Sequence, residues 1–163
     1  GIFISRTIPL NIIVPAEKFL LSSSELPYVF MGGWHSPFER RLLKKLLSAG
    51  KESIFFTSKG IKNQSLYKYY KKTITGKRLV IVSLLLEMGK VTLDNSIKRN
   101  EMVADIAEHN LFIFINRGGN LESLFNKLLS QSRVPLVFNH SANSVFLKKG
   151  KPISLENFKE ILL

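Results

Sequence analysis

The chain has 163 residues, of which 45% are hydrophobic; it has no cysteine, and its formal net charge is +12. This length predicts a single domain, residues 1–163, with a full hydrophobic core. The lack of cysteine excludes a disulfide framework, a thiolate nucleophile and a cysteine-ligated zinc site, and it favours a cytoplasmic setting. No apolar run approaches the roughly 20 residues that a membrane-spanning helix needs, so no membrane partner is expected.

The positive charge is concentrated in one segment. Residues 40–99 contain fifteen Lys or Arg and three acidic residues, whereas the rest of the chain has nine of each sign. Such a segment is typical of a protein that binds a polyanion, and nucleic acid is the commonest one. A solvated lysine-rich surface without a binding role fits the same composition equally well.

Two short elements open the chain. Residues 2–5 read as an apolar strand, and Ser5 and Arg6 stand where that strand meets its loop. Residues 11–21 are predicted to form a helix, with Pro15 tolerated only in its first turn.

A second strand, residues 28–31, is followed by Gly32 and Gly33. Two glycines after a buried strand let the backbone approach a ligand closely, although a plain tight turn is the more frequent use of such a pair. The pair therefore leaves both a binding turn and a structural turn open.

The clearest local signal comes next, where Ser36 to Glu39 have the pattern of a capping box that starts a helix. Gly50 is placed to end that helix. The start of the helix is also suited to an anion near His35 and Ser36, although a structural cap is the more frequent role of such a serine. No histidine lies at metal-ligand spacing from another, so no metal site is predicted. The polar face of the helix carries four cations: Arg40, Arg41, Lys44 and Lys45.

Residues 53–57 and 79–82 are predicted as the third and fourth strands, with Lys59 in the loop after the third. Aromatic and cationic residues alternate between these strands, namely Tyr67, Lys68, Tyr69, Tyr70, Lys71 and Lys72. The aromatic rings can stack on bases while the cations hold phosphates. Packing of one or two tyrosines over the sheet edge explains the same pattern equally well. Residues 84–92 have no assignment.

The stretch 98–129 combines a helix, a strand, a glycine turn and a second helix. Arg99 and Asn100 are expected to open the first helix, and Arg99 falls on the apolar stripe of that helix, so it should lean toward the sheet. Residues 111–115 are an unbroken apolar run, typical of a parallel strand covered on both faces.

Gly118 and Gly119 then make a turn into a helix that begins near Asn120. The first N–H groups of that helix have no partner inside it, so they favour an anion beyond the strand end. Residues 135–138 and 145–147 are expected to be late strands, and Ser154 is expected to cap a final helix.

This alternation of strands and helices predicts an α/β domain with three layers, in which helices flank a mainly parallel sheet. Ligands bind such sheets at the carboxyl ends of the strands, near the topological switch point. Seven candidate residues are expected to follow a strand or to stand at a helix start, and therefore to converge on one edge of the sheet: Arg6, Gly32, Gly33, Lys59, Arg99, Gly118 and Gly119.

The segments ISR, MGGWHSPFER, TSKGI and RNEMVADIAEHNLFIFINRGGNLESL resemble the Rossmann-like (SLOG) domain of the DNA-processing protein family, DprA or Smf, over nearly the whole chain. The resemblance implies a basic pocket for the phosphates of single-stranded DNA, lined by Ser5, Arg6, Gly32, Gly33, Arg99 and Asn100. The helix start at Gly119 and Asn120 is similar to that of the family. Trp34 and His35 depart from the small residues that follow the glycines in the family.

The same resemblance implies no catalytic residue and no cofactor. It implies that the chain binds single-stranded DNA, helps to load a recombinase, and acts in DNA uptake or recombination; a homodimer is a further option.

The alternative is a nucleotide-binding sensor or a phosphoribohydrolase-like domain, similar to the lysine-decarboxylase-like (LOG) group. In those enzymes a catalytic glutamate follows the glycine turn, at the position that Ser123 holds here. Glu122 is one residue short of that position, and Asn100 stands where those enzymes have lysine. The carboxylate is out of register, so general acid/base catalysis is poorly supported.

Overall fold

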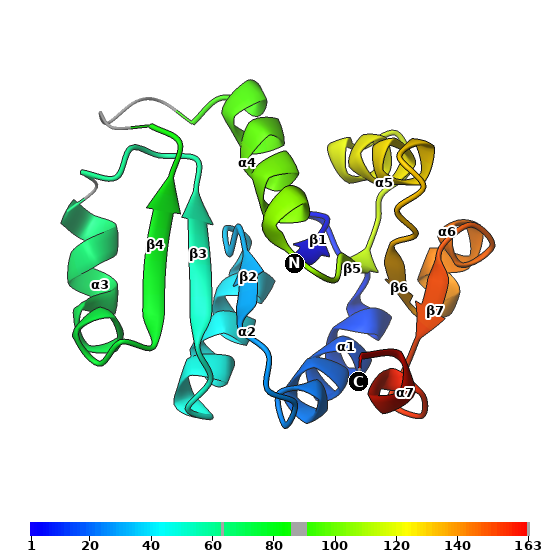
Figure 1. The fold of residues 1–163 in the computed structure, drawn as a ribbon, viewed down its shortest axis with the longest axis horizontal. Helices are drawn as coiled ribbons and strands as arrows, with labels where there is room; N and C mark the ends of the chain where they lie inside the picture. Colours follow the sequence, from blue (N-terminus) through cyan, green and yellow to red (C-terminus); the bar gives the residue numbers. More distant parts are fainter. Residues whose placement is uncertain (63, 86–90, 163) are drawn as a thin grey trace. The chain divides into compact units, whose positions relative to one another are not determined.

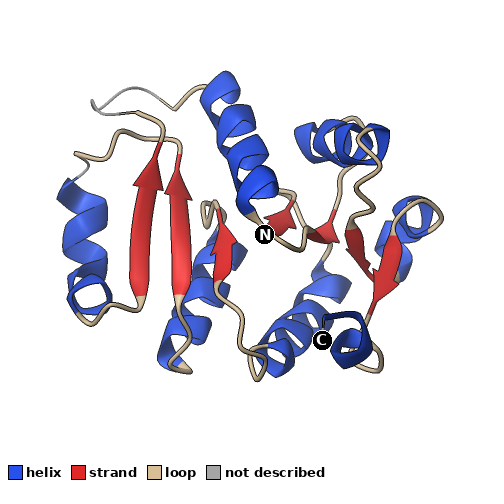
Figure 2. Ribbon diagram, viewed as in Figure 1, coloured by secondary structure: helices blue, strands red, loops and turns tan. Residues whose placement is uncertain are grey.

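The structure is a computed structural model that describes residues 1–62, 64–85 and 91–162. The chain divides into two compact units. We call Gly1–Leu26 with Ala107–Leu163 the terminal unit, and Pro27–Ile106 the central unit. In each unit the paired strands are parallel and helices pack beside them (Figures 1 and 2). The predicted α/β class, a parallel sheet flanked by helices, is confirmed, and a single domain over residues 1–163 stays a prediction.

In the terminal unit, four strands lie side by side in the order β1 (Ile2–Ile4), β5 (Leu111–Phe114), β6 (Leu136–Phe138) and β7 (Lys151–Ile153). The helices of this unit are α1 (Leu10–Ser23), α5 (Asn120–Ser130), α6 (Ser144–Leu147) and α7 (Phe158–Leu162), with a 3-10 turn η1 (Ser141–Asn143) before α6. All four residues of β5 are buried, as the apolar run predicted. The Phe112 ring stacks on Phe3 at 4.8 Å and meets Phe125 edge-on at 5.5 Å, so aromatic contacts join β1, β5 and α5.

In the central unit, three strands run in the order β2 (Phe30–Gly32), β3 (Ser53–Thr57) and β4 (Leu79–Ser83), and β4 is an edge strand. The helices are α2 (Pro37–Ser48), α3 (Gln64–Thr75) and α4 (Leu93–Ile106). Helix α3 lies beside β4, while α4 packs on β2 and β3 (Figure 1). In the described parts of both units, no helix is long and apolar enough to cross a bilayer.

The capping box at the start of α2 is confirmed. The Ser36 hydroxyl accepts the Glu39 N–H at 3.2 Å, and the Glu39 carboxylate accepts the Ser36 N–H at 2.7 Å. Four leucines, Leu42, Leu43, Leu46 and Leu47, form the buried stripe of this helix.

Helix α4 begins earlier than the sequence predicted. It starts at Leu93, so Arg99 and Asn100 lie in the middle of the helix and not at its start. Thr92 supplies the cap, because its hydroxyl accepts the Asn95 N–H at 3.1 Å. This cap lies at the edge of the segment left without an assignment, most of which falls outside the described residues.

Helix α1 also differs from the prediction. It begins at Leu10, which places Pro15 inside the helix and beyond its first turn. Proline has no N–H for the carbonyl of Asn11, and both residues are exposed, so water can bond that carbonyl instead.

The end of the chain was predicted least well. Residues 145–147 form part of α6 and not a strand, and the last strand is β7, which follows them. A three-residue apolar run carries no usable periodicity, which explains the error. Helix α7 starts at Phe158, later than predicted, because the Asn157 side chain accepts the Ser154 N–H at 2.7 Å and holds a turn there.

Three helices end with a residue in the left-handed backbone region. These residues are Gly50 (φ 79°), Lys77 (φ 56°) and Ser132 (φ 59°), after α2, α3 and α5. Each end has the paired bonds of a Schellman motif; after α5 the Ser132 N–H reaches Leu129 and the Arg133 N–H reaches Leu128, both at 3.0 Å. Glycine adopts this conformation without steric cost, whereas lysine and serine do not.

Replacing Ser132 by glycine should therefore stabilise the protein. We expect Ser132→Gly to raise the free energy of unfolding by about 0.5 kcal/mol, and Gly50→Ala to lower it by about 1 kcal/mol. Urea denaturation of both variants measures the two changes. A destabilised Ser132→Gly variant would contradict the strain assigned to this helix end.

Candidate functional site

A glycine and an arginine from distant parts of the central unit meet at the end of β2. A Cβ atom built on Gly33 would lie 2.7 Å from Cζ of Arg99 and 2.9 Å from each terminal guanidinium nitrogen. A Cβ atom does not lie so close to another heavy atom, so any larger residue at this position must displace the guanidinium. The missing side chain of Gly33 is what lets the half-buried Arg99 reach the carboxyl end of β2.

The neighbouring residue fixes the orientation of that guanidinium. Asn100 Oδ1 accepts hydrogen bonds from Nε of Arg99 at 3.1 Å and from Nη2 at 2.7 Å. A planar guanidinium held through two of its donors presents a fixed charge and a fixed geometry, which suits an oxyanion. The structure thus brings together three of the residues selected from the sequence: Gly33, Arg99 and Asn100.

The loop after Gly33 is held down by a buried tryptophan. Trp34 is 1% exposed, and its indole N–H donates to the carbonyl of Ile54 in β3 at 2.9 Å. Its backbone has φ 48°, a left-handed conformation that costs a bulky residue free energy. The buried ring and its hydrogen bond offset this cost, so Trp34 positions the Gly33 loop and offers no surface for a ligand.

The amides that follow Trp34 are already engaged. The N–H groups of His35 and Ser36 both donate to Oε2 of Glu39, at 3.1 and 2.7 Å. The His35 ring packs edge-on against Phe55 at 5.7 Å. The observed role of Ser36 is the structural cap, and an anion at this helix start would meet a carboxylate.

Lys59 lies in a loop that ties β3 to β4. Its N–H donates to Thr57 Oγ1 at 3.1 Å, and its carbonyl accepts the Ser83 hydroxyl at 2.7 Å. The Lys59 side chain is exposed at the carboxyl end of the parallel strands, the same edge at which Gly32 ends β2 and Gly33 follows it.

The terminal unit has its own strand-end turn, at the carboxyl ends of β1 and β5. Ser5 Oγ accepts the Asn116 N–H at 2.8 Å, so this buried hydroxyl joins the two strand ends. The Gly118 N–H donates to Glu122 Oε2 at 2.5 Å, and the Gly119 N–H donates to the Asn116 carbonyl at 3.2 Å. The glycine turn is therefore closed by the third residue of its own helix.

The start of α5 still presents two amides. Its first intrahelical acceptor is the Gly119 carbonyl, which takes the Glu122 N–H, so the Asn120 and Leu121 N–H groups precede the first bond of the helix. Arg6 is exposed in the loop that follows Ser5, within the same unit. A phosphate at this turn would use these two amides and Arg6, against the negative charge of Glu122.

The predicted basic surface lies on the outer faces of α2 and α3. All seven of its residues are exposed, namely Arg40, Arg41, Lys44, Lys45, Lys68, Lys71 and Lys72. Among the tyrosines of α3, Tyr70 is 7% exposed and takes the packing role considered above, whereas Tyr67 and Tyr69 are 47% and 74% exposed. Burial raises the pKa of the Tyr70 hydroxyl, with Tyr69 adding to the rise, so that ring belongs to the core.

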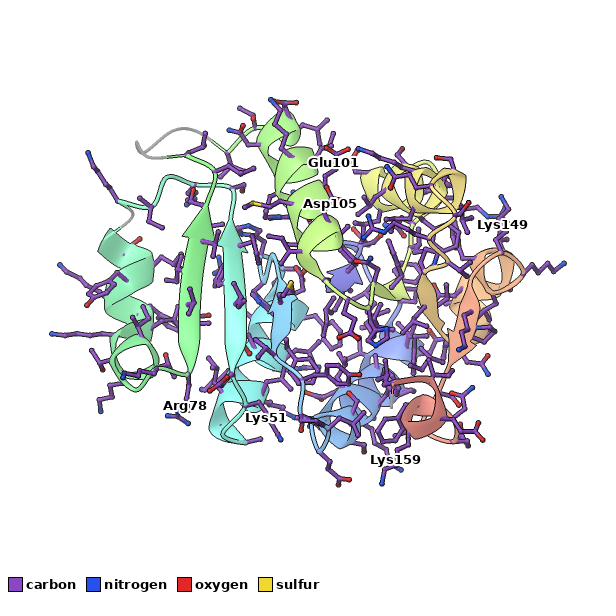
Figure 3. All side chains as sticks on the ribbon, viewed as in Figure 1. Lys51, Arg78, Glu101, Asp105, Lys149 and Lys159 are labelled. Carbon is purple, nitrogen blue, oxygen red and sulfur yellow. The ribbon has the colours of Figure 1, made fainter. Side chains whose placement is uncertain are left out.

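Other charged residues of the central unit are not part of the contact between Gly33 and Arg99. Figure 3 shows Lys51 and Arg78 near the amino ends of β3 and β4, and Glu101 and Asp105 on α4. Gly33 follows the carboxyl end of β2, which is the opposite edge of these parallel strands. Lys98 is paired with Asp94 at 2.8 Å, and that hydrogen bond raises its pKa. The described residues contain no group of three His, Cys, Asp or Glu placed to hold a metal ion.

Parallel strands that alternate with helices, with Gly33 and Arg99 in contact at the carboxyl end of β2, make this a Rossmann-like domain. No protein-family model matches the sequence, and no curated protein matches it either. Among solved structures, DNA processing protein A (DprA) from Streptococcus pneumoniae matches 98% of this chain with a TM-score of 0.79 and 13% identity. DNA processing protein A from Helicobacter pylori matches 99% of it with a TM-score of 0.73 and 12% identity.

This chain spans 59% of the Streptococcus pneumoniae protein and 78% of the Helicobacter pylori protein. The likeness establishes the fold: the chain has the Rossmann-like fold of DNA processing protein A, as the resemblance of its segments implied.

A buried asparagine that was not selected from the sequence joins two strand ends. Asn143 is fully buried, and its Nδ2 donates to the carbonyls of Ile113 at 2.8 Å and Phe138 at 3.0 Å, while its Oδ1 accepts the Ile115 N–H at 3.4 Å. It ties the carboxyl ends of β5 and β6 together. Nothing in the local pattern HSANS distinguishes this asparagine from one in a solvated loop.

Removing that side chain should destabilise the protein strongly, because three buried backbone groups would lose their partner. We expect Asn143→Ala to lower the free energy of unfolding by about 3 kcal/mol. The exposed Asn126 of α5 is the matched control, and Asn126→Ala should stay within about 0.5 kcal/mol of the parent protein. Denaturant unfolding of the two variants tests the contrast, which would disappear if Asn143 were not a clamp.

Proposed function

We propose that this chain is a non-catalytic domain that binds single-stranded DNA in the manner of DNA processing protein A. The fold similarity supports the proposal, since the Helicobacter pylori protein has a single-stranded DNA binding mode. The observation that carries it is the Arg99 guanidinium seated against Gly33 and oriented by Asn100. In this proposal Arg99 holds a phosphate of the strand.

Further contacts follow from the positions of the other residues. Lys59 and the exposed cations of α2 and α3 supply positive charge along the central unit, and Arg6 with the Asn120 amide forms a second phosphate position in the terminal unit. Ser5, His35 and Ser36 shape these loops through the hydrogen bonds described above. We keep a recombinase partner, a homodimer and a cytoplasmic location as expectations of the same proposal, with a role in DNA uptake or recombination.

The removal of the Arg99 side chain tests the phosphate seat. Arg99→Ala should weaken the binding of a labelled single-stranded oligonucleotide about tenfold, because a charge-assisted hydrogen bond to phosphate is lost. The slope of log affinity against log salt should fall by about 0.7, the contribution of one phosphate contact to a single strand. Fluorescence anisotropy at several salt concentrations measures both quantities.

Two further variants make this test specific. Gly33→Ala keeps the arginine but pushes its guanidinium away, so it should reproduce much of the loss seen with Arg99→Ala. Arg133 is a half-buried arginine at the amino end of β6, and Arg133→Ala should bind like the parent protein. Absence of oligonucleotide binding by the parent protein at low salt would refute the proposed function.

Glu122 gives a test of the turn in the terminal unit. Glu122→Gln keeps an oxygen that can accept the Gly118 N–H but removes a negative charge beside the proposed phosphate, so affinity should rise about threefold. Glu108→Gln is the control, because Glu108 is exposed at the amino end of β5 in the same unit. Equal affinities for the two variants in the anisotropy assay would show that the oligonucleotide does not contact this turn.

A further inference from the structure

A cavity lies in the central unit, between α3 and the edge of the sheet. It has a volume of about 440 Å³ and is lined by strand, loop and helix residues, including Ile61, Tyr67, Ile74, Lys77, Val80 and Ile81. Thr57 is the last residue of β3, and its hydroxyl already accepts the Lys59 N–H. The lining is mostly apolar, and this cavity is separate from the Arg99 seat.

The segment that contains β3, α3 and β4 carries charge of a single sign. Residues 53–86 contain no acidic residue and seven cations, namely Lys59, Lys62, Lys68, Lys71, Lys72, Lys77 and Arg78. Lys77 lines the cavity itself. An occupant that carries negative charge outside the cavity and an apolar or aromatic group inside it matches this distribution, since opposite charges complement each other across an interface.

Aromatic residues and the edge strand indicate which chemical group the cavity can receive. Tyr67 lines the cavity and is 47% exposed, so its ring can be contacted by a second flat ring. Val80, which is 56% exposed, belongs to the edge strand β4, whose outer side can offer backbone hydrogen-bonding groups. A nucleobase has both a stacking face and polar edges.

The backbone at Lys77 makes this residue useful for a test of the site. This residue keeps a left-handed φ of 56° at the end of α3, where glycine would fit without strain. The same conformation ends α5 at Ser132, so it belongs to the helix end and does not by itself mark a ligand site. What distinguishes Lys77 from Ser132 is that its side chain lines the cavity.

We propose that the cavity between α3 and β4 receives one unstacked base of the bound single strand, with its phosphates along Lys77 and the cations of α3. This inference rests on the proposed function and adds a base subsite to the phosphate seat at Arg99. Such a subsite gives the protein a preference for single strands, because a base paired in a duplex cannot enter it.

Tyr67 and Tyr69 provide a matched pair for the test. Both are tyrosines of α3, but Tyr67 lines the cavity and Tyr69 points to solvent with 74% exposure. Tyr67→Ala should weaken the binding of a labelled oligothymidylate about tenfold, the effect of losing one base stack, whereas Tyr69→Ala should leave it within about twofold. Equal losses in both variants would mean that bases stack on the open face of the helix, which overturns the subsite.

Lys77→Gly separates binding from stability. It relieves the left-handed strain, so its midpoint of thermal unfolding should rise, while its affinity for the oligonucleotide should fall about threefold. Ser132→Gly is the control, because it relieves the same strain in the terminal unit and should leave affinity unchanged. Unchanged affinity of Lys77→Gly would remove Lys77 from the proposed site.

Photochemical crosslinking locates the base directly. An oligonucleotide with one 5-iododeoxyuridine should crosslink to Tyr67 in the parent protein, and Ile74→Trp, which fills the cavity, should abolish the crosslink. Normal affinity with crosslinks elsewhere refutes the subsite alone, and loss of affinity in Arg99→Ala then still supports the proposed function. Absence of binding by the parent protein refutes both proposals.

Discussion

The contact between Arg99 and Gly33 is the constraint on which the candidate site depends. A long cationic side chain in the middle of α4 reaches the end of β2 only because the residue there has no Cβ. Asn100 then fixes the plane of the guanidinium. This arrangement also requires the packing of α4 on β2 and β3, so the fold of the central unit and the position of its charge are set by the same contacts.

The two glycine turns share a further feature that reduces the number of backbone amides available to an anion. At the start of α2 and of α5, the glutamate at the third helical position, Glu39 or Glu122, accepts backbone N–H groups from the residues ahead of the helix. These carboxylates stabilise the helix ends and occupy amides that would otherwise face a phosphate. Side-chain cations must therefore supply most of the attraction, which makes binding sensitive to salt.

Local patterns predicted the elements whose ends are set by nearby residues. The capping box of α2, the buried strand β5 and the start of α5 at Asn120 all follow from short-range rules, and the structure has them where the sequence placed them. The start of α4 was missed because a single threonine, Thr92, caps it without a glutamate three residues later. Short apolar runs near the end of the chain were ambiguous between strand and helix.

The candidate site was predicted only in part, for a physical reason. Gly33, Arg99 and Asn100 were selected from the sequence, but their contact joins residues more than sixty positions apart and depends on packing that no local pattern encodes. The roles of Trp34 and Asn143 were missed for the same cause, since each is explained by hydrogen bonds to a distant strand.

Trp34 and Lys77 both have a left-handed backbone, but they differ in what offsets the resulting strain. At Trp34 the cost is offset inside the fold, by a buried ring and a hydrogen bond to β3. Lys77 is an exposed residue, and its Schellman bonds would form equally well with glycine. The left-handed conformation is therefore a cost of the helix end, as it is at Ser132 after α5. What sets Lys77 apart from Ser132 is that its side chain lines the cavity between α3 and β4, and a cation at that position fits the base subsite proposed above.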